Sequence, residues 1–232
     1  MPSCHDLDFM RMAGVLQPYD STGWSIASTI VLDLQRTEDE LLRRMEKTTR
    51  YEIRRGTEQG EFAMEIFLSP QAEAIAQFCD FYDMAANYKF RRPIYRPRLY
   101  SLAAFNMLLL TSAGTTTPLV WHAYVASKER VMLLYSASSF RENESSAARN
   151  LAARANRCLH WNDILQAKRA GAALYDMGGI DTENRSPKTS RIAQFKRGFG
   201  GEIVSTYART LATSLKGRLA LGLLSLATSK YQ

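Results

Sequence analysis

The chain has 232 residues, and 46% of them are hydrophobic, which is enough to bury the core of one large domain and excludes a disordered chain. Its 30 lysines and arginines exceed its 23 acidic residues and give a net charge of +7. This balance favours an anionic partner such as tRNA, a nucleotide diphosphate or a lipid surface, and it does not choose among them.

The cysteines and the apolar runs bear on location. Cys4, Cys79 and Cys158 are odd in number and widely spaced, and the first residues are polar and acidic rather than typical of a signal peptide. The longest apolar run, residues 219–227, is far shorter than the ~20 residues that span a bilayer. We therefore expect a cytoplasmic protein with reduced thiols and no transmembrane helix.

The first long helix is expected at residues 37–55. Thr37 followed by Glu40 fits a capping box, and Gly56 follows the last helical residue. Cations at helical spacing make one face of this helix a candidate site for tRNA or phosphate: Arg43, Lys47, Arg50 and Arg54. The ordinary alternative is a solvated surface face, but four cations without an intervening acid repel one another, which an anion opposite them would explain.

A strand is expected at residues 62–67, and a helix from Pro70 to about Tyr88. The next segment, residues 90–100, is expected to be a loop stiffened by Pro93 and Pro97. Its cations and one tyrosine are candidate substrate-binding residues: Arg91, Arg92, Tyr95, Arg96 and Arg98. Alternatively, the arginines only neutralise neighbouring carboxylates, and both interpretations stay open.

A helix is expected at residues 100–110, followed by strands at residues 119–125 and 131–136 that a polar turn joins. Further on, Cys158 and His160 are two residues apart and would point to different sides of a helix, so we interpret both as core residues. His122 falls inside an expected strand. Since no set of Cys, His or carboxylate residues has zinc-ligand spacing, no metal site is predicted.

Two glycine-containing segments near the end of the chain stand out. A short apolar run ends at Asp176 and the pair Gly178 and Gly179, a pattern that predicts a strand entering a tight loop. Lys196 then precedes a glycine-rich turn at residues 198–201, whose backbone amides can approach an anion. Alternatively, these glycines only end a helix and begin a strand at residues 202–207.

The pairing of Tyr-Asp-Met-Gly-Gly-Ile (residues 175–180) with Phe-Lys-Arg-Gly-Phe-Gly-Gly-Glu (residues 195–202) resembles the Fem family of tRNA-dependent aminoacyltransferases that build peptidoglycan bridges. Residues 29–60 and 159–171 are also similar to this family. The resemblance implies a mixed α/β (α+β), acetyltransferase-like (GNAT-type) fold, with a central mixed sheet flanked by helices.

The resemblance also implies a domain organisation. Members of the family usually contain two GNAT-type domains, and 232 residues are few for two. We therefore expect the aminoacyltransferase domain at residues 29–209 and an extension, or a remnant of a first domain, at residues 1–28. Residues 210–232 carry leucines at helical spacing among cations. This expected amphipathic helix either packs on the domain or lies in the headgroup region of an anionic membrane, at its inner face.

The activity that the resemblance implies is transfer of an amino acid from aminoacyl-tRNA to an amine of a peptidoglycan precursor, either nucleotide- or lipid-linked. Lys196 is then expected at the reaction centre, where it stabilises the oxyanion or holds the terminal phosphate of the tRNA. Asp176 is expected to orient the amine or accept its proton, or alternatively to cap the loop amides. Substrate-binding roles are implied for their neighbours: Phe195, Arg197, Gly178 and Gly179.

No cofactor is expected. Coenzyme-A-dependent relatives carry a glycine-containing cradle after the strand hairpin, whereas residues 141–158 contain no glycine. Aminoacyl-tRNA is therefore the expected donor. Two other functions stay open: a GNAT-like acyltransferase of polysaccharide or small-molecule biosynthesis that uses another acyl donor, and an RNA- or membrane-binding module without activity.

Overall fold

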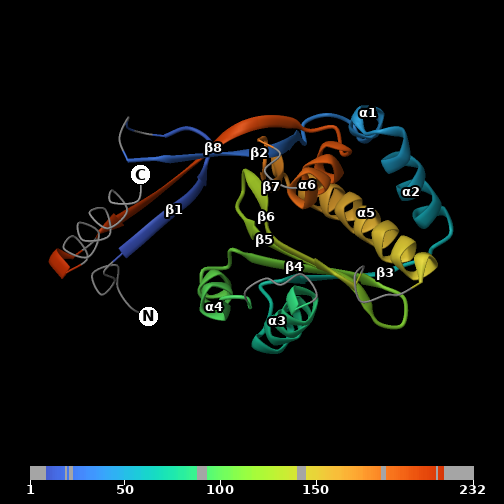
Figure 1. Cartoon of the computed structure of the whole chain (residues 1–232), viewed down its shortest axis with the longest axis horizontal. Helices are drawn as coiled ribbons and strands as arrows, with labels where there is room; N and C mark the ends of the chain where they lie inside the picture. Colours follow the sequence, from blue (N-terminus) through green and yellow to red (C-terminus); the bar gives the residue numbers. More distant parts are fainter. Residues whose placement is uncertain are drawn as a thin grey trace. The chain divides into compact units, whose positions relative to one another are not determined.

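The computed structural model describes residues 9–18, 20, 23–87, 93–139, 145–183, 187–212 and 214–216 (Figure 1). Its eight strands hydrogen-bond in the order β1-β8-β2-β7-β6-β5-β4-β3, and helices flank the sheet. The mixed α/β fold expected from the sequence is therefore confirmed. The chain divides into two compact units, one of Ile30–Glu202 and one of Met1–Thr29 together with Ile203–Gln232.

The larger unit contains most of the sheet. Strands β3 (Ala63–Leu68), β4 (Leu108–Gly114), β5 (Pro118–Ala126) and β6 (Arg130–Ser138) pair antiparallel in sequence order. β7 (Leu174–Ile180) joins β6 in parallel, and β2 (Ser25–Asp33) follows β7 in the strand order. The expected hairpin around residues 127–130 is confirmed as the connection from β5 to β6.

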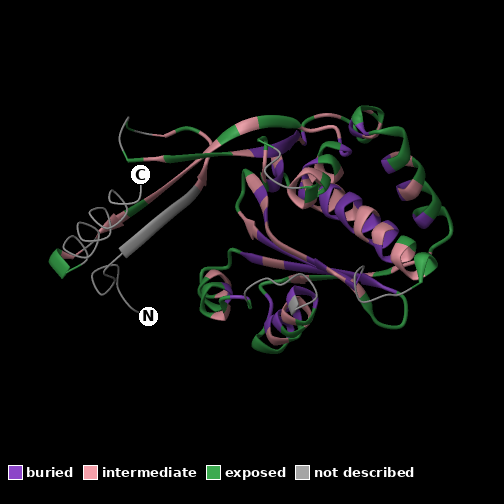
Figure 2. Ribbon diagram, in the orientation of Figure 1, coloured by how far each residue is buried: buried purple, intermediate pink, exposed green. Residues whose placement is uncertain are grey.

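The described residues of this unit form the helices α1 (Glu38–Arg44), α2 (Lys47–Glu58), α3 (Ala72–Asn87), α4 (Arg96–Ala104), α5 (Ser146–Arg169) and α6 (Pro187–Arg197). α3 and α4 lie on one side of strands β3–β6 and α5 lies on the other (Figure 1). Phe78 and Leu99 pack with Trp121 on the first side, while Ile164 packs with Tyr175 on the second. Buried positions recur along α5 and along the central strands (Figure 2).

The first predicted helix is two helices. The capping box at its start is confirmed, because Glu40 donates its backbone N–H to the Thr37 hydroxyl and Thr37 N–H donates to the Glu40 carboxylate. α1 then ends at Met45, which is buried and extended, and the N–H of Glu46 donates to the carbonyl of Gly198 at 2.9 Å. The hydrogen bond to Gly198 thus interrupts residues 37–55, although their local sequence pattern is helical throughout.

The prediction for residues 90–110 is wrong in two places. α4 begins within the expected loop at Arg96, since proline is tolerated in the first helical turn and Pro97 stands there. The expected helix at residues 100–110 ends at Ala104, Asn106 takes φ 54°, and Leu108 begins β4. β4 pairs with a strand on each side, which stabilises the extended conformation of an apolar stretch that fits either structure.

The smaller unit joins segments from far apart in the sequence. β1 (Phe9–Val15) pairs antiparallel with β8 (Glu202–Ala212), so that Phe9 lies opposite Ala212. Residues 210–212, the expected start of the C-terminal helix, therefore lie in a strand. Residues 217–232, which carry the rest of that expected helix, lie outside the described residues. Among the helices that the structure describes, none is long and apolar enough to cross a bilayer.

Candidate functional site

The structure brings together the two segments that carry the family resemblance. Lys196, near the end of α6, donates from Nζ to the carbonyl oxygens of Gly178 at 3.2 Å and Gly179 at 2.8 Å. Both glycines lie within β7, which continues to Ile180; the expectation that the strand gives way to a loop at Asp176 is wrong. Gly178 lies within β7 with φ +74°, a conformation that glycine adopts without strain.

Lys196 lies close to the place where two parallel strands stop pairing. The ladder between β6 and β7 consists of Arg130 with Leu174, Val131 with Tyr175, and Met132 with Asp176. Both strands run on, to Ser138 and Ile180, and the structure describes all of their residues. Beyond this ladder, the carbonyl oxygens of Gly178 and Gly179 in β7 accept their hydrogen bonds from Lys196.

Asp176 is fully buried and both of its carboxylate oxygens accept hydrogen bonds. Oδ1 accepts from the backbone N–H of Gly178 at 2.7 Å, and Oδ2 accepts from the guanidinium of Arg130. In this arrangement the carboxylate fixes the strand at the glycine pair, which is the capping alternative considered from the sequence. Its role in orienting or deprotonating an amine stays a prediction.

The glycine-rich turn after α6 is tightly packed. Gly200 has φ +76°, and a Cβ added to it would collide with the carbonyl of Arg44. A Cβ on Gly198 would lie 2.8 Å from the hydroxyl of Thr49. These contacts explain the glycines as residues that let the turn approach α1 and α2. Of the expected substrate-binding residues beside the turn, Phe195 is half-buried and Arg197 is exposed.

The segments expected to bind phosphate are divided in the structure. Because α1 ends before α2 begins, Arg43 does not share one helical face with Lys47, Arg50 and Arg54, which all lie in α2. Arg50 donates to carbonyl oxygens at the end of α1, among them that of Arg43 at 3.2 Å, and Arg54 lies 3.9 Å from Glu58. A single cationic face is therefore a wrong description, although the phosphate-binding role of each residue stays a prediction.

The arginine-rich segment gives a similar result. Arg96 donates to Asp80 at 2.7 Å and to Asp83 at 3.3 Å, which matches the alternative that it neutralises carboxylates. Tyr95 and Arg98 are exposed. Arg91 and Arg92 lie outside the described residues. Of the residues expected at the reaction centre, Lys196 and Asp176 both hydrogen-bond to the glycine pair.

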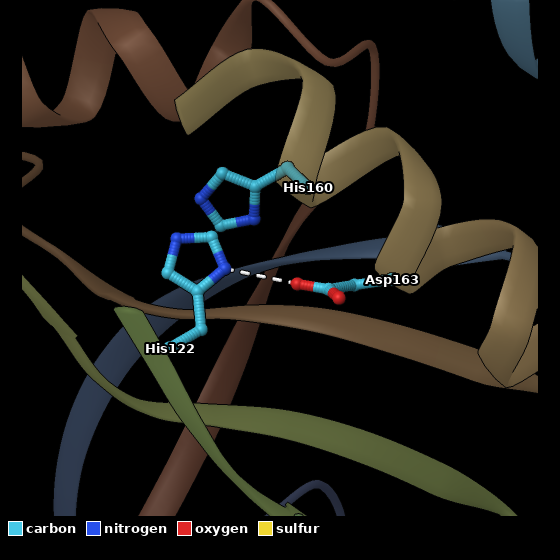
Figure 3. Close-up of side chains that lie close together, drawn as sticks. All are labelled: His122, His160 and Asp163. Atoms are coloured by element: carbon cyan, nitrogen blue, oxygen red, sulfur yellow. Dashed lines mark hydrogen bonds and ion pairs between the residues drawn. The ribbon is translucent and has the colours of Figure 1, made fainter. Parts of the chain in front are cut away.

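A buried polar cluster lies between α5 and the sheet, and sequence reasoning did not find it. His122 Nδ1 and Asp163 Oδ2 are 2.9 Å apart, and the ring of His160 lies over that of His122 (Figure 3). Tyr124 donates to Asp163 at 2.5 Å, and its hydroxyl is 2.8 Å from that of Tyr175. His160 Nδ1 lies 2.7 Å from the Tyr175 hydroxyl and completes the chain of contacts.

His122, His160 and Asp163 are also ligand types that suit a metal ion, and their ligand atoms lie within 4.8 Å of one another. Their geometry argues for hydrogen bonding instead. His122 Nε2 lies 2.9 Å from Asn156 Oδ1, and the two imidazole rings are tilted, with centroids 4.1 Å apart and planes 33° from parallel. A shared ion would have to displace hydrogen bonds that both histidines make within the protein.

Burial shifts the pKa values of His160, Tyr124 and Tyr175 in this cluster. Desolvation, followed by the charges of His122, Lys196 and Arg157, holds the pKa of His160 well below 6.5. Desolvation and the nearby Asp163 raise the pKa of Tyr175 well above 10. The pKa of Tyr124 is also raised well above 10, and its protonated hydroxyl connects Asp163 with Tyr175, the residue before Asp176. The neutral His160 imidazole contacts the Tyr175 hydroxyl. Through its contacts with Tyr175, the cluster holds β7 next to the candidate site.

No protein-family model and no curated protein matches this chain. Solved structures do. FemX has a TM-score of 0.62 and 13% identity, and the match covers 86% of this chain and 65% of FemX. The C-terminal domain of a provisionally named lysylphosphatidylglycerol synthetase from Agrobacterium fabrum has a TM-score of 0.56 and 14% identity, with 94% and 66% covered. L-PGS from Bacillus licheniformis has a TM-score of 0.51 and 10% identity, with 86% and 65% covered.

These matches establish the fold. The chain has the α/β architecture of FemX and of the two synthetase structures, and it spans about 65% of the length of each. At 10–14% identity the likeness does not extend to substrates.

Proposed function

We propose that this protein is an aminoacyltransferase that moves an amino acid from aminoacyl-tRNA to an amine of a peptidoglycan precursor. One observation carries the proposal: the Lys196 ammonium is held against the Gly178 and Gly179 carbonyls beside the end of the β6–β7 ladder. Supporting it, the sequence segments that resemble the Fem family are those that meet there, and FemX shares the fold.

The chemistry needs positioning and charge more than covalent help. The acceptor amine attacks the ester carbonyl carbon, a peptide bond forms, and the bond to the tRNA oxygen breaks. The amine proton leaves and the tRNA oxygen takes up a proton. Negative charge develops on the carbonyl oxygen in between, and a fixed ammonium stabilises it without reorganising. Two carbonyl acceptors limit where the Lys196 Nζ can lie, and this supports such a role.

A lipid acceptor is the second candidate. The structure from Agrobacterium fabrum covers 94% of this chain, and its name describes a synthetase of a lysine-bearing phospholipid. An aminoacyl donor would serve both acceptors, with a hydroxyl as nucleophile in place of an amine. The net charge of +7 suits an anionic lipid as well as tRNA.

The test measures transfer of a labelled amino acid from charged tRNA, with a peptidoglycan precursor in one arm and phosphatidylglycerol vesicles in another. Lys196→Ala is expected to lower turnover by about 10²-fold, as loss of an oxyanion-stabilising group does. Transfer to lipid alone would select the second candidate. Wild-type turnover by a folded Lys196→Ala protein would refute the role of Lys196, and no transfer in either arm would refute the proposed function.

Lys168 provides a matched control. Its Nζ also donates to two carbonyl oxygens, those of Leu34 and Arg36, each at 2.8 Å. Lys168→Ala removes the same kind of contact away from the candidate site. It is expected to lower stability and to leave turnover per folded molecule unchanged.

A further inference from the structure

Arg157 of α5 is a cation to which neither the sequence nor the proposed function assigns a role. Its guanidinium carbon lies 5.2 Å from the centre of the Phe195 ring, and Phe195 directly precedes Lys196. The same ring packs against Phe199 and His160, at centroid distances of 5.5 and 5.8 Å. Arg157 therefore belongs to the immediate surroundings of the segment that carries Lys196.

Among the described residues, no carboxylate forms an ion pair with Arg157. Its guanidinium donates to the carbonyl of Ala153, one turn earlier in its own helix, at 3.2 Å. Its Nε is buried and has no hydrogen-bond partner, and no carboxylate among the described residues lies within ion-pair distance. Desolvation lowers the pKa of Arg157, with the distant charges of Glu52 and Glu46 acting in the opposite direction.

Arg154, three residues earlier, shows how the same helix treats a structural arginine. Its Nε donates to Glu52 at 2.7 Å and its Nη1 donates to both oxygens of Glu61 at 2.7 Å. Desolvation opposes the charge, but these carboxylates outweigh it and raise the pKa of Arg154. Among the described residues, Arg154 therefore has carboxylate partners and Arg157 has none.

A half-buried guanidinium without an anion is unfavourable, because its lost hydration is not replaced. It also acts electrostatically in the same place as Lys196, since both cations lower the pKa of His160, after desolvation and His122. The planar fork of arginine binds phosphate and carboxylate groups through two hydrogen bonds. Arg157 therefore has the planar guanidinium that binds oxyanions, and it lies against Phe195, next to Lys196 in the chain. Among the described residues it has no carboxylate partner, so a bound anion would stabilise it.

We propose that Arg157, beside Lys196, binds an oxyanion group of the substrate, either a phosphate or a carboxylate. The proposed function supplies two sources of that group, and in this the inference rests on it. One source is a phosphodiester at the end of the tRNA donor, and the other is a carboxylate of a peptide acceptor. The competing account is that Arg157 only covers the Phe195 ring, in which case an uncharged side chain would serve equally well.

The experiment measures binding by calorimetry, without turnover, to the full chain. The probes are inorganic phosphate, the RNA trinucleotide cytidylyl-cytidylyl-adenosine, and N-acetylalanine. Arg157→Gln is expected to weaken binding of the preferred probe by about tenfold or more, as loss of charged hydrogen bonds does. Preference for the trinucleotide identifies the phosphodiester source, and preference for N-acetylalanine identifies the carboxylate source.

Arg154→Gln is the matched control, and it is expected to lower the melting temperature and to keep the affinity of the folded protein. Arg157→Gln is expected to melt no lower than wild type, because it removes a desolvated charge. Should either glutamine variant fail to fold, Arg157→Lys keeps the charge without the fork and is expected to bind more weakly than wild type. Arg209→Gln, a change beside Asp20, then replaces Arg154→Gln.

Two outcomes overturn the inference: wild-type protein that binds none of the three probes, and a folded Arg157→Gln protein with unchanged affinity for all of them. The fate of the proposed function is separate. Arg157-dependent binding of the trinucleotide without amino-acid transfer from charged tRNA would refute the transferase and leave the anion site intact. Amino-acid transfer that Arg157→Gln does not change would support the transferase and refute the anion site.

Discussion

Replacing Gly178 by alanine tests the contact between β7 and β6 at the candidate site. A Cβ at this position would lie 2.7 Å from the carbonyl oxygen of Leu133 and 3.6 Å from Lys196 Nζ. The oxygen belongs to the backbone of β6, so it cannot rotate away as a side chain can. Either β6 or β7 must move.

The expected loss has two parts. Gly178 has φ +74°, and an L-residue in the left-handed region costs about 1–2 kcal/mol. Displacing packed backbone to admit an extra methyl group adds about 1–3 kcal/mol. Gly178→Ala is therefore expected to lower the free energy of unfolding by about 2–5 kcal/mol.

Gly171 separates the two parts. Its φ is +85°, but a Cβ added there meets no atom within 4 Å. Gly171→Ala is expected to cost only the conformational part, about 1–2 kcal/mol. Urea unfolding of both variants, followed by circular dichroism, measures the difference. Equal losses would refute the reasoning, because they would mean that β6 and β7 accommodate the methyl group freely.

Three further predictions concern buried groups. Below pH 6.5 the unfolded chain takes up a proton at His160 that the folded protein, with its lowered pKa, does not, so stability falls by about 1.4 kcal/mol per pH unit. That slope is approached only below the unfolded pKa, so denaturant titrations at pH 6.5 and 5.5 should show a loss of about 1 kcal/mol in wild type and not in His160→Asn. Burial raises the pKa of Cys158 to about 12, so iodoacetamide at pH 8 should modify it only in unfolded protein, as peptide mass spectrometry can verify; modification of the native thiol would contradict this. Arg154→Gln leaves two carboxylates without their cation and should cost about 3–5 kcal/mol in the same denaturant assay, whereas a loss under 1 kcal/mol would mean that water replaces the guanidinium.

Local signals in the sequence predicted local structure well. The capping box at Thr37 and Glu40 places a helix start, since both hydrogen bonds form within four residues. The hairpin of β5 and β6 follows from two β-rich runs around a polar turn. The end of α1 could not be predicted in this way, because Gly198 bonds to Glu46 from 152 positions further along the chain.

The candidate site shows the same limit. The pairing of the two glycine-containing segments was expected, and Lys196 contacts Gly178 and Gly179. Extension of β7 through those glycines was not, because glycine pairs usually signal turns. The cluster around Asp163 was missed because its histidines and tyrosines come from β5, α5 and β7. Each of those residues alone resembles ordinary core, and only the fold brings their polar atoms together.

The pairing of β1 with β8 has a consequence for synthesis on the ribosome. Phe9 lies opposite Ala212, so β1 has to wait until residues 16–201 have been synthesised before its partner strand is made. The larger unit, with neighbouring strands and helices that are close in sequence, can fold in the meantime, whereas closing so long a loop is slow. An unpaired β1 edge is then open to other nascent chains and to chaperones. Expression at lower temperature, or with abundant chaperone, should therefore raise the yield of folded protein chiefly through this last strand pair.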